Sequence, residues 1–415
     1  MLFQTKFVAK CRICGSNSLR DILDFGNMHL TGVFLDDGAM VPEAPLKLVQ
    51  CNSCFLVQLG NNYSQEFLYG ETYGYESHLN KSMVQHLTRK ARQLESRYLS
   101  SIKSPVVVDI ASNDGTMLSG YTNQASKLVG IDPIAQNLAN CYPKNVTIIN
   151  NFFSADEFFA RIDEKANLVT SLSVLYDLDN PLQFISNIYE ILAEGGVWHF
   201  EQSYMPLMVE TSSYDTICHE HLLYLSMHDI VNLCKKAGFQ IASASLNSIN
   251  GGSIAVTAVK STKKIQNDPY VEFLLQEEKD LGYQSSTRII EFADKARIHK
   301  DKLSALVADY LKQDNAIFAL GASTKGNVLL QWLQFDHSKI LKIGDINPKK
   351  FGKETPGTKI PIQDEGEVLS QFGESSVGIV LPWHFREGII QNCSDYLSKG
   401  GRLLFPLPAI QIVSN

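Results

Sequence analysis

Short apolar runs, each about the length of one strand, recur through the middle of the chain between segments long enough to form helices. Strands that alternate with helices indicate a parallel sheet with helices on both faces. The pattern therefore predicts an α/β domain of Rossmann-like type in the middle of the chain. Its expected strands are residues 106–109, 128–131, 146–149, 168–171 and 196–200.

A second series of apolar runs follows a polar, charged stretch over residues 270–313. That stretch has helical character and predicts a connector between two domains. The second series predicts another, smaller Rossmann-like α/β domain. Its expected strands are residues 316–320, 340–343, 377–381 and 402–405.

The start of the chain differs from both series because it holds two Cys-x-x-Cys pairs among short strand-like pieces. Two residues between paired cysteines let the backbone turn back so that both thiolates face one ion. In a long chain this spacing is typical of metal binding rather than of a disulfide framework. We expect zinc, because nothing else in the sequence suggests redox chemistry. The four ligands of this closed, structural site would be Cys11, Cys14, Cys51 and Cys54.

Length and charge limit the remaining possibilities. A chain of 415 residues is too long for one ordinary domain. We expect a zinc-binding domain over residues 1–75, a central domain over 76–260 and a C-terminal domain over 261–415. The formal net charge of −7 argues against a nucleic-acid binder. Without an apolar run of about 18 residues or a convincing signal peptide, we expect a cytoplasmic monomer with no membrane partner.

The turn after the first central strand, Asp109-Ile-Ala-Ser-Asn-Asp-Gly115, is where a Rossmann-like sheet binds its ligand, and we expect a helix to begin near Thr116 after it. It has one glycine where a pyrophosphate-binding turn needs three, and Asp114 would repel phosphate. A cationic sulfonium ligand with an amino-acid tail tolerates that acid, so the loop favours S-adenosylmethionine. A purely structural Asn-Asp-Gly turn is the alternative.

An acidic residue, Asp132, ends the next strand, where such folds hold the ribose hydroxyls of the ligand. Phe152 or Phe153 follows the third strand and would stack on the adenine or lie in the core. The expected cofactor contacts are Asp109, Ala111, Ser112, Asn113, Asp114, Asp132, Phe152, Phe153 and Ser173.

Residues 214–224 carry the densest group of reactive side chains, with His219, Glu220 and His221 in succession. Adjacent residues cannot all point the same way, so we expect His221 toward the substrate and Glu220 or His219 in support. The spacing is not that of a His-Glu-x-x-His zinc site. A histidine that titrates near neutral pH suits general-base removal of a proton from carbon.

The segment Gly321-Ala-Ser-Thr-Lys-Gly326 follows an apolar strand and opens a helix. Backbone N–H groups at a helix start favour phosphate oxygens, and Lys325 adds a compensating charge. It lacks the spacing of a P-loop. A small-residue turn without a ligand remains the alternative.

These motifs together resemble the three-domain sugar C-methyltransferases that act on nucleotide-linked 4-keto-deoxysugars, such as the tetronitrose C-3′-methyltransferase group. The resemblance covers nearly the whole chain. It rests on the two cysteine pairs, on Ser112-Asn-Asp-Gly-Thr116, on His219-Glu-His-Leu222 and on Gly321-Ala-Ser-Thr-Lys-Gly-Asn327. Supporting pieces are Asn250-Gly-Gly-Ser253, Asp345-Ile-Asn-Pro348, Pro356-Gly-Thr358 and Leu381-Pro-Trp-His384.

The resemblance implies a mechanism and a set of roles. A base removes the proton at C-3 of the sugar, and the resulting enolate attacks the methyl group of the cofactor. His221 would be the base, Glu220 would position it or the sugar, and Tyr73 and Tyr75 would reach the same site. The sugar nucleotide would bind through Gly321, Ala322, Ser323, Thr324, Lys325, Asp345 and Asn347.

Two departures from the family pattern stand out. Cys218 lies three residues before the expected base, where relatives often have an aromatic residue, and Ser173-Val-Leu-Tyr-Asp177 replaces a segment that tends to hold Asn and His.

Rival functions are O- or N-methylation of a sugar, and an inactive nucleotide-binding zinc protein. An NAD-dependent sugar enzyme is disfavoured by the single-glycine loop and by the lack of a Tyr-x-x-x-Lys pair.

Overall fold

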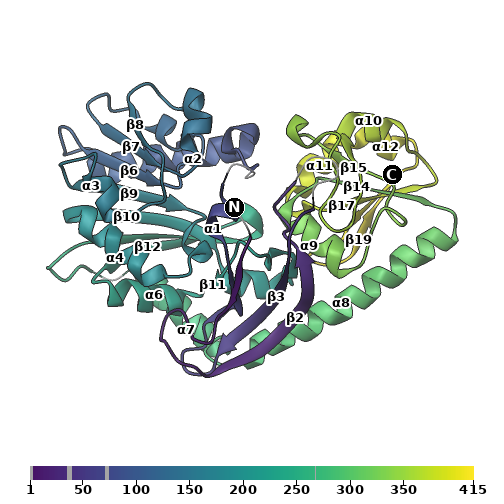
Figure 1. The fold of residues 1–415 in the computed structure, drawn as a ribbon, viewed down its shortest axis with the longest axis horizontal. Coiled ribbons are helices and arrows are strands. Elements are labelled where there is room, and N and C mark those ends of the chain that lie inside the picture. Colours follow the sequence, from purple (N-terminus) through teal and green to yellow (C-terminus); the bar gives the residue numbers. More distant parts are fainter. Residues whose placement is uncertain (1–2, 35–39, 71–73, 267) are drawn as a thin grey trace.

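The computed structural model describes residues 3–34, 40–70, 74–266 and 268–415. Two α/β lobes stand side by side, and the long strands β2 and β3 and the helix α8 run beneath them (Figure 1). The expected three-part α/β architecture is confirmed. The boundaries near residues 75 and 260 stay predictions.

The central lobe is built on a seven-stranded sheet in the order β12-β13-β10-β9-β6-β7-β8. Neighbouring strands from β8 to β10 run parallel, while β13 is antiparallel to both β10 and β12. The strands are β6 (Val106–Ile110), β7 (Lys127–Ile131), β8 (Val146–Ile149), β9 (Ala166–Leu172), β10 (Leu192–Ser203), β12 (Gln240–Asn247) and β13 (Ser253–Val259).

The chain order reverses between β6 and β9, since β7 and β8 lie on one side of β6 and β10 lies on the other side of β9. Ligands of parallel α/β sheets bind at such a switch point, beyond the carboxyl ends of the strands. All five residues of β6 are buried, as a central parallel strand covered on both faces requires. The helices of this lobe are α2 (Lys81–Leu94), α3 (Ala155–Phe159), α4 (Pro181–Ile191), α5 (Met205–Glu210) and α6 (Met227–Lys236).

The prediction of a helix beginning near Thr116 is wrong, because only a 3-10 turn, η3 (Leu118–Gly120), follows the loop. The reason is the packing of α2 on this side of the sheet. A side chain at Gly120 would meet the Ala91 side chain at 2.7 Å, so the two segments touch closely. Leu87 and Ala91 of α2 share a core cluster with Leu118, and α2 thereby covers the position of the expected helix.

The second lobe has a six-stranded sheet in the order β16-β15-β14-β17-β18-β19, parallel except for β19. Its order reverses between β14 and β17, so this sheet also has a switch point. The second expected strand of this domain is shifted, since the structure has a strand at residues 343–345 rather than 340–343. The strands are β14 (Ala316–Leu320), β15 (Ile343–Asp345), β16 (Ile362–Asp364), β17 (Ser376–Val380), β18 (Arg402–Phe405) and β19 (Gln411–Val413), and the helices are α9 (Thr324–Trp332), α10 (Glu365–Ser370), α11 (Arg386–Asn392) and α12 (Ser394–Ser398).

The N-terminal residues form a four-stranded antiparallel sheet whose outer strand comes from the middle of the chain. The order is β11-β4-β3-β2, in which β11 (Leu223–Tyr224) directly follows the His-Glu-His segment. The first segment of the chain is therefore joined to that segment by backbone hydrogen bonds. The other elements of this part are β1 (Thr5–Phe7), β2 (Leu19–His29), β3 (Glu43–Cys51), β4 (Val57–Leu59), β5 (Asn61–Tyr63) and α1 (Gln65–Leu68).

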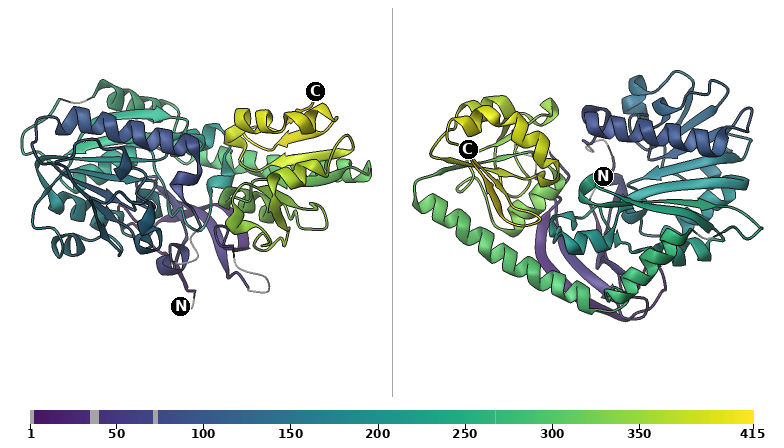
Figure 2. Two further views of the ribbon diagram at one scale, coloured as in Figure 1. Left: turned by 90° about the horizontal axis from the view of Figure 1, so that it is seen from above. Right: turned by 180° about the vertical axis from the view of Figure 1, so that it is seen from behind.

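The expected connector consists of two helices, α7 (Pro269–Asp280) and α8 (Thr287–Lys312). Figure 2 shows α8 crossing beneath the N-terminal sheet from one lobe to the other. None of the helices that the structure describes is both long and apolar enough to cross a membrane.

Candidate active site

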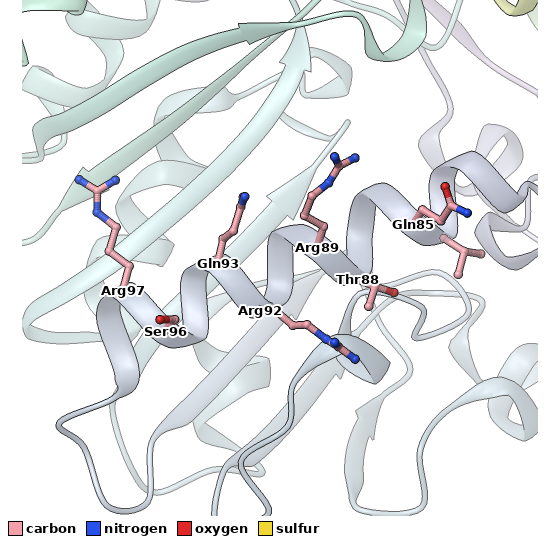
Figure 3. A pocket seen from close by; sticks show the side chains of 8 residues that line it. Gln85, Thr88, Arg89, Arg92, Gln93, Ser96 and Arg97 are labelled. Atoms are coloured by element: carbon pink, nitrogen blue, oxygen red, sulfur yellow. The ribbon is translucent and has the colours of Figure 1, made fainter.

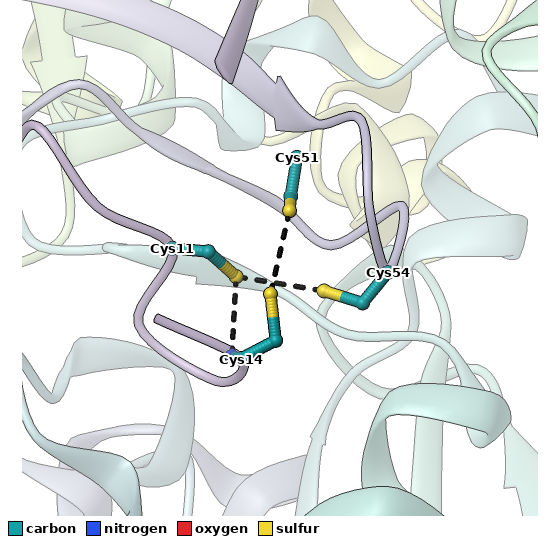
Figure 4. Close-up of side chains that lie close together, drawn as sticks. All are labelled: Cys11, Cys14, Cys51 and Cys54. Atoms are coloured by element: carbon teal, nitrogen blue, oxygen red, sulfur yellow. Dashed lines mark hydrogen bonds between the residues drawn. The ribbon is translucent and has the colours of Figure 1, made fainter. Parts of the chain in front are cut away.

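The four paired cysteines converge from two loops (Figure 4). Their Sγ atoms all lie within 4.8 Å of one another, and the Cys11–Cys54 and Cys14–Cys51 sulfur pairs are 3.5 Å apart. Zinc bound to four thiolates at about 2.3 Å places the sulfurs a little under about 4 Å apart. The cluster therefore fits a tetrahedral ion, and it lies apart from the candidate catalytic side chains described below.

The loops at the central switch point have strained backbones. Ala111 and Asn113 after β6, and Ser173 after β9, have positive φ angles of 55°, 50° and 58°. Non-glycine residues in this conformation cost free energy and gather where a site requires a particular backbone shape. Adjacent strands thus carry strained turns at the edge where a ligand is expected.

Asp132 holds the cofactor loop in shape. Its two carboxylate oxygens accept hydrogen bonds from the backbone N–H of Asn113, at 3.0 Å, and of Ile134, at 2.9 Å. A carboxylate has about four lone-pair sites, so both oxygens can still accept bonds from ribose hydroxyls. Ser112 Oγ lies 2.7 Å from the hydroxyl of Tyr142, a residue that sequence reasoning missed.

Asn113 and Asp114 are tied to the segment that precedes α2. Asn113 accepts from the backbone N–H of Ser77 and donates to the carbonyl of Tyr75. Asp114 accepts from the N–H and Nδ1 of His78 at 2.8 and 2.9 Å and, through its other oxygen, from Thr116. The carboxylate of Asp114 therefore already has hydrogen-bond partners within the chain. Tyr73 lies outside the described residues.

The other expected cofactor contacts differ in accessibility. Asp109 is buried, where its Oδ1 accepts a 2.6 Å bond from the Thr170 hydroxyl, and burial raises its pKa to about 7. Phe153 packs edge-on against Phe184 in the core. Phe152 keeps 37% of its surface exposed at the carboxyl end of β8, so of the two rings it is the one available to a ligand.

The side chains of the His-Glu-His segment diverge, as their adjacency requires. His219 is fully buried toward the N-terminal sheet, with its ring edge-on to Tyr63 and Nε2 3.3 Å from the Ala44 carbonyl. Glu220 points toward Gly32, where any side chain would overlap its Oε1. Of the three, His221 is half-buried, whereas His219 and Glu220 are buried.

His221 has the geometry of a general base. Its Nδ1 lies 2.8 Å from the Thr216 carbonyl, which can only accept, so Nδ1 carries the proton and Nε2 keeps a free lone pair. Tyr176 packs edge-on against the ring at 4.4 Å. Burial, with a smaller contribution from Lys325, lowers the pKa of His221 to about 4, so the ring is neutral at pH 7.

Buried polar atoms without a hydrogen-bond partner gather around this segment. Such atoms are rare in folded proteins and need an explanation. Within the described ranges they include Asp177 Oδ1, Asp215 Oδ1, His219 Nδ1, Glu220 Oε2 and His384 Nδ1. Asp215 and His384, like His221, interact electrostatically with Lys325, so their unpartnered atoms fit a polar ligand at this place.

The second switch point meets the same segment from the other lobe. Lys325, at the start of α9, donates from Nζ to the Asn250 carbonyl at 2.7 Å. Trp383, after β17, donates from Nε1 to Asp215 at 2.8 Å. Sequence reasoning missed Asp215, whose only signal was an acid within a mixed polar and apolar stretch.

The small residues expected to bind the sugar nucleotide line up at the carboxyl end of β14. Gly321 has a φ of 78°, and any side chain there would strike the Pro382 ring. Ser323 caps α9 by accepting from the Gly326 N–H, and Thr324 begins the helix. Asp345 accepts from the backbone N–H groups of Ala322 and Asn347, so it shapes this loop from within.

A separate surface hollow lies along one face of α2 (Figure 3). Arg89, Arg92 and Arg97 are among its lining residues. It is built from a single helix, and none of the candidate site residues lines it.

Three family models match the chain in succession. Residues 11–69 match a "Putative zinc binding domain", residues 83–244 a methyltransferase domain and residues 248–408 a C-methyltransferase C-terminal domain. The C-methyltransferase NovU of Streptomyces niveus is 28% identical over 98% of this chain and 97% of its own.

The solved structures that are similar each cover less than half of this chain. The magnesium protoporphyrin IX methyltransferase ChlM from Synechocystis, with bound SAH, is 18% identical over 47% of this chain and 92% of its own, with a TM-score of 0.33. The plantazolicin methyltransferase BpumL is 13% identical over 44% of this chain and 86% of its own, with a TM-score of 0.36. Scores of this size carry no argument about substrate or mechanism.

Proposed function

Because the chain belongs to the three-domain C-methyltransferases, we propose that it methylates carbon 3 of a nucleotide-linked 4-keto-6-deoxy sugar. The methyl donor is S-adenosylmethionine, which supplies an electrophilic methyl group. The observation that carries the proposal is the neutral His221, whose Nε2 lone pair is free among buried polar atoms that lack partners.

The residues at the central switch point bind the methyl donor. Asp132 accepts hydrogen bonds from the ribose hydroxyls, and Phe152 stacks on the adenine. The backbone of Ala111, Ser112 and Asn113, bent by positive φ angles, approaches the amino-acid end. Asp109, Asp114 and Ser173 hold these turns in place, since their hydrogen bonds run to other groups of the chain.

His221 acts as the general base. Its Nδ1–H, held by the Thr216 carbonyl, directs Nε2 at the C-3 proton, which is acidic because the neighbouring C-4 is a ketone. Glu220 orients the sugar beside it, with Tyr73 and Tyr75 as further contacts. His219, buried against Tyr63, supports the segment from the N-terminal side.

The C-terminal lobe binds the nucleotide. N–H groups at the start of α9 receive the diphosphate, and Lys325 offsets its charge. Asp345 and Asn347 lie on the same edge of the second sheet and contact the remainder of the nucleotide. We assign a structural zinc ion to Cys11, Cys14, Cys51 and Cys54, where it holds the N-terminal sheet together.

Deuterium exchange at the acceptor carbon tests this proposal directly. The protein is incubated in D₂O with dTDP-4-keto-6-deoxyglucose and no methyl donor, and the C-3 proton is followed by NMR. We expect its signal to disappear, because His221 forms the enolate without needing the second substrate. Repeating the assay with guanosine and cytidine analogues identifies the nucleotide.

The product identifies the reaction. With S-adenosylmethionine present, we expect a mass gain of one methyl group and a new carbon–carbon bond at C-3. The absence of exchange together with an O-methyl or N-methyl product would overturn the proposal in favour of heteroatom methylation.

A further inference from the structure

Asp177 lies at the centre of the candidate site although no role has been given to it so far. It ends the 3-10 turn η5 (Leu175–Asp177), directly after the strained turn that follows β9. The preceding residue, Tyr176, packs its ring on His221 with 4.4 Å between centroids. The Gln65 side chain holds the Asp177 carbonyl at 3.2 Å. The backbone of Asp177 is thus held next to a residue whose ring contacts the base.

Among the described residues, no cation contributes to the electrostatic environment of this carboxyl group. Its Oδ1 is buried and has no hydrogen-bond partner in the part of the chain that the structure describes. Two neighbouring groups change the pKa of Asp177: a hydrogen bond from the Tyr69 hydroxyl lowers it, and the second carboxyl group, that of Glu220, raises it. Glu220 Oε2 is likewise buried without a partner. The two carboxyl groups therefore lie close enough to act on each other electrostatically, and each has one buried oxygen without a partner.

Such a pair cannot be fully ionised, because a buried charge without a counter-charge is costly and like charges repel. Burial raises the pKa of Asp177 well above its ordinary value and also raises that of Glu220. Glu220 has donors of its own, since the Cys218 thiol and the Gly32 N–H both favour its ionised form. Asp177 has one such donor, the Tyr69 hydroxyl, so of the two groups it is the one that more readily holds a proton.

We propose that Asp177 is a catalytic acid whose carboxyl O–H donates a hydrogen bond to the enolate oxygen formed when His221 removes the C-3 proton. This rests on the proposed function. His221 Nε2 takes the proton, the C–H electron pair forms the carbon–carbon double bond, and the carbonyl π pair moves onto oxygen. The Asp177 O–H donates a hydrogen bond to that oxygen. The proton stays on Asp177 when the enolate carbon takes the methyl group and the ketone is regenerated.

The proposed reaction needs a hydrogen-bond donor to the enolate oxygen. Enolate formation places a full charge on one oxygen, and a single preorganised donor to such an oxygen contributes about 10²–10³-fold in rate. Cys218, also fully buried in this segment, is only a weak donor. A neutral aspartic acid in an apolar site performs this task in ketosteroid isomerase. Asp177 likewise has one carboxyl oxygen, Oδ1, that is buried without a partner, although the residue as a whole is only half-buried.

Two substitutions of Asp177 distinguish whether it acts as a neutral hydrogen-bond donor or as a charged carboxylate. Asp177→Asn keeps a neutral side chain with N–H donors, whereas Asp177→Ala removes the donor. In the C-3 deuterium assay without a methyl donor, we expect Asp177→Ala to slow exchange by about 10²–10³-fold. We expect Asp177→Asn to retain exchange within about tenfold of the native rate. Asp163→Ala, which changes an exposed carboxylate, is the matched control and should exchange normally.

The outcomes are distinguishable from failure of the proposed function. If the native protein exchanges C-3 and Asp177→Ala exchanges equally fast, Asp177 has no part in the reaction and this inference is overturned. If Asp177→Asn is as slow as Asp177→Ala while both bind the sugar nucleotide and melt like the native protein, the group acts as a carboxylate instead. If the native protein exchanges no 4-keto sugar nucleotide, the proposed function itself is wrong.

Discussion

Trp383 of the C-terminal lobe donates a 2.8 Å hydrogen bond from Nε1 to Asp215 Oδ2, and Asp215 lies in the 3-10 turn η6 (Tyr214–Thr216) just before the segment that carries His221. Both residues are buried, and the second oxygen of Asp215 has no partner among the described residues. The catalytic segment is thereby attached to the lobe proposed to bind the nucleotide.

Trp383→Phe should lower the free energy of unfolding by about 1–3 kcal/mol, because it leaves the buried Asp215 carboxyl without its donor. Urea denaturation measures the change. Trp332→Phe is a matched control, since that ring is equally buried and no hydrogen bond is recorded for its Nε1. Equal losses in the two variants would mean that ring volume, not the hydrogen bond, accounts for the effect.

His221→Asn should reduce C-3 deuterium exchange by about 10²–10⁴-fold, the usual contribution of a general base. Binding of S-adenosylhomocysteine, measured by calorimetry, should not change, because the cofactor loops lie on other elements. Exchange near the native rate would show that another group removes the proton.

The pH profile of exchange provides an independent check on the same residue. Burial lowers the pKa of His221 to about 4, below the ordinary value of 6.5, so the neutral base dominates at every pH above about 5. Between pH 5.5 and 7.5 the exchange rate should show no loss of activity with a midpoint near 6.5. An acid limb centred between pH 6 and 7 would contradict the burial of this ring.

Asp132→Ala should weaken S-adenosylhomocysteine binding by about 10–100-fold. The substitution removes the carboxylate oxygens that accept hydrogen bonds from the ribose. It also leaves the Asn113 and Ile134 N–H groups, whose bonds to Asp132 shape the loop, without their acceptor. Titration calorimetry gives the affinity. Asp163→Ala again serves as the control, and an unchanged affinity in Asp132→Ala would remove this residue from the cofactor site.

Removal of the metal should disturb the catalytic segment although no cysteine ligand lies beside His221. The strand β4 pairs with β11 through Gln58 and Leu223, and His219 packs on Tyr63, so the N-terminal sheet supports the residues around the base. After chelation we expect a lower thermal midpoint and faster amide exchange at Leu223 and Tyr224. Cys141→Ser, at an exposed cysteine outside the cluster, should change neither.

Local pattern predicted much of this molecule. Hydrophobic runs located the strands on either side of the loop at Asp109, because a strand buried on both faces must be continuously apolar. Cysteine spacing predicted the thiolate cluster, because a two-residue gap suits a single ion. The helix expected at Thr116 is wrong, because close packing of α2 against Gly120 overrides a local preference.

The sequence by itself therefore determined the zinc-binding part, the two α/β parts, the position of the cofactor turn and the motif that carries His221. Only the tertiary structure decided how these parts share one site. Asp177 and Glu220 come from different segments, as do Asp215 and Trp383, and their pairing depends on long-range contacts that no local pattern encodes. The protonation of a carboxyl group depends on the burial that those contacts create, so the acid at Asp177 emerged only from the folded chain.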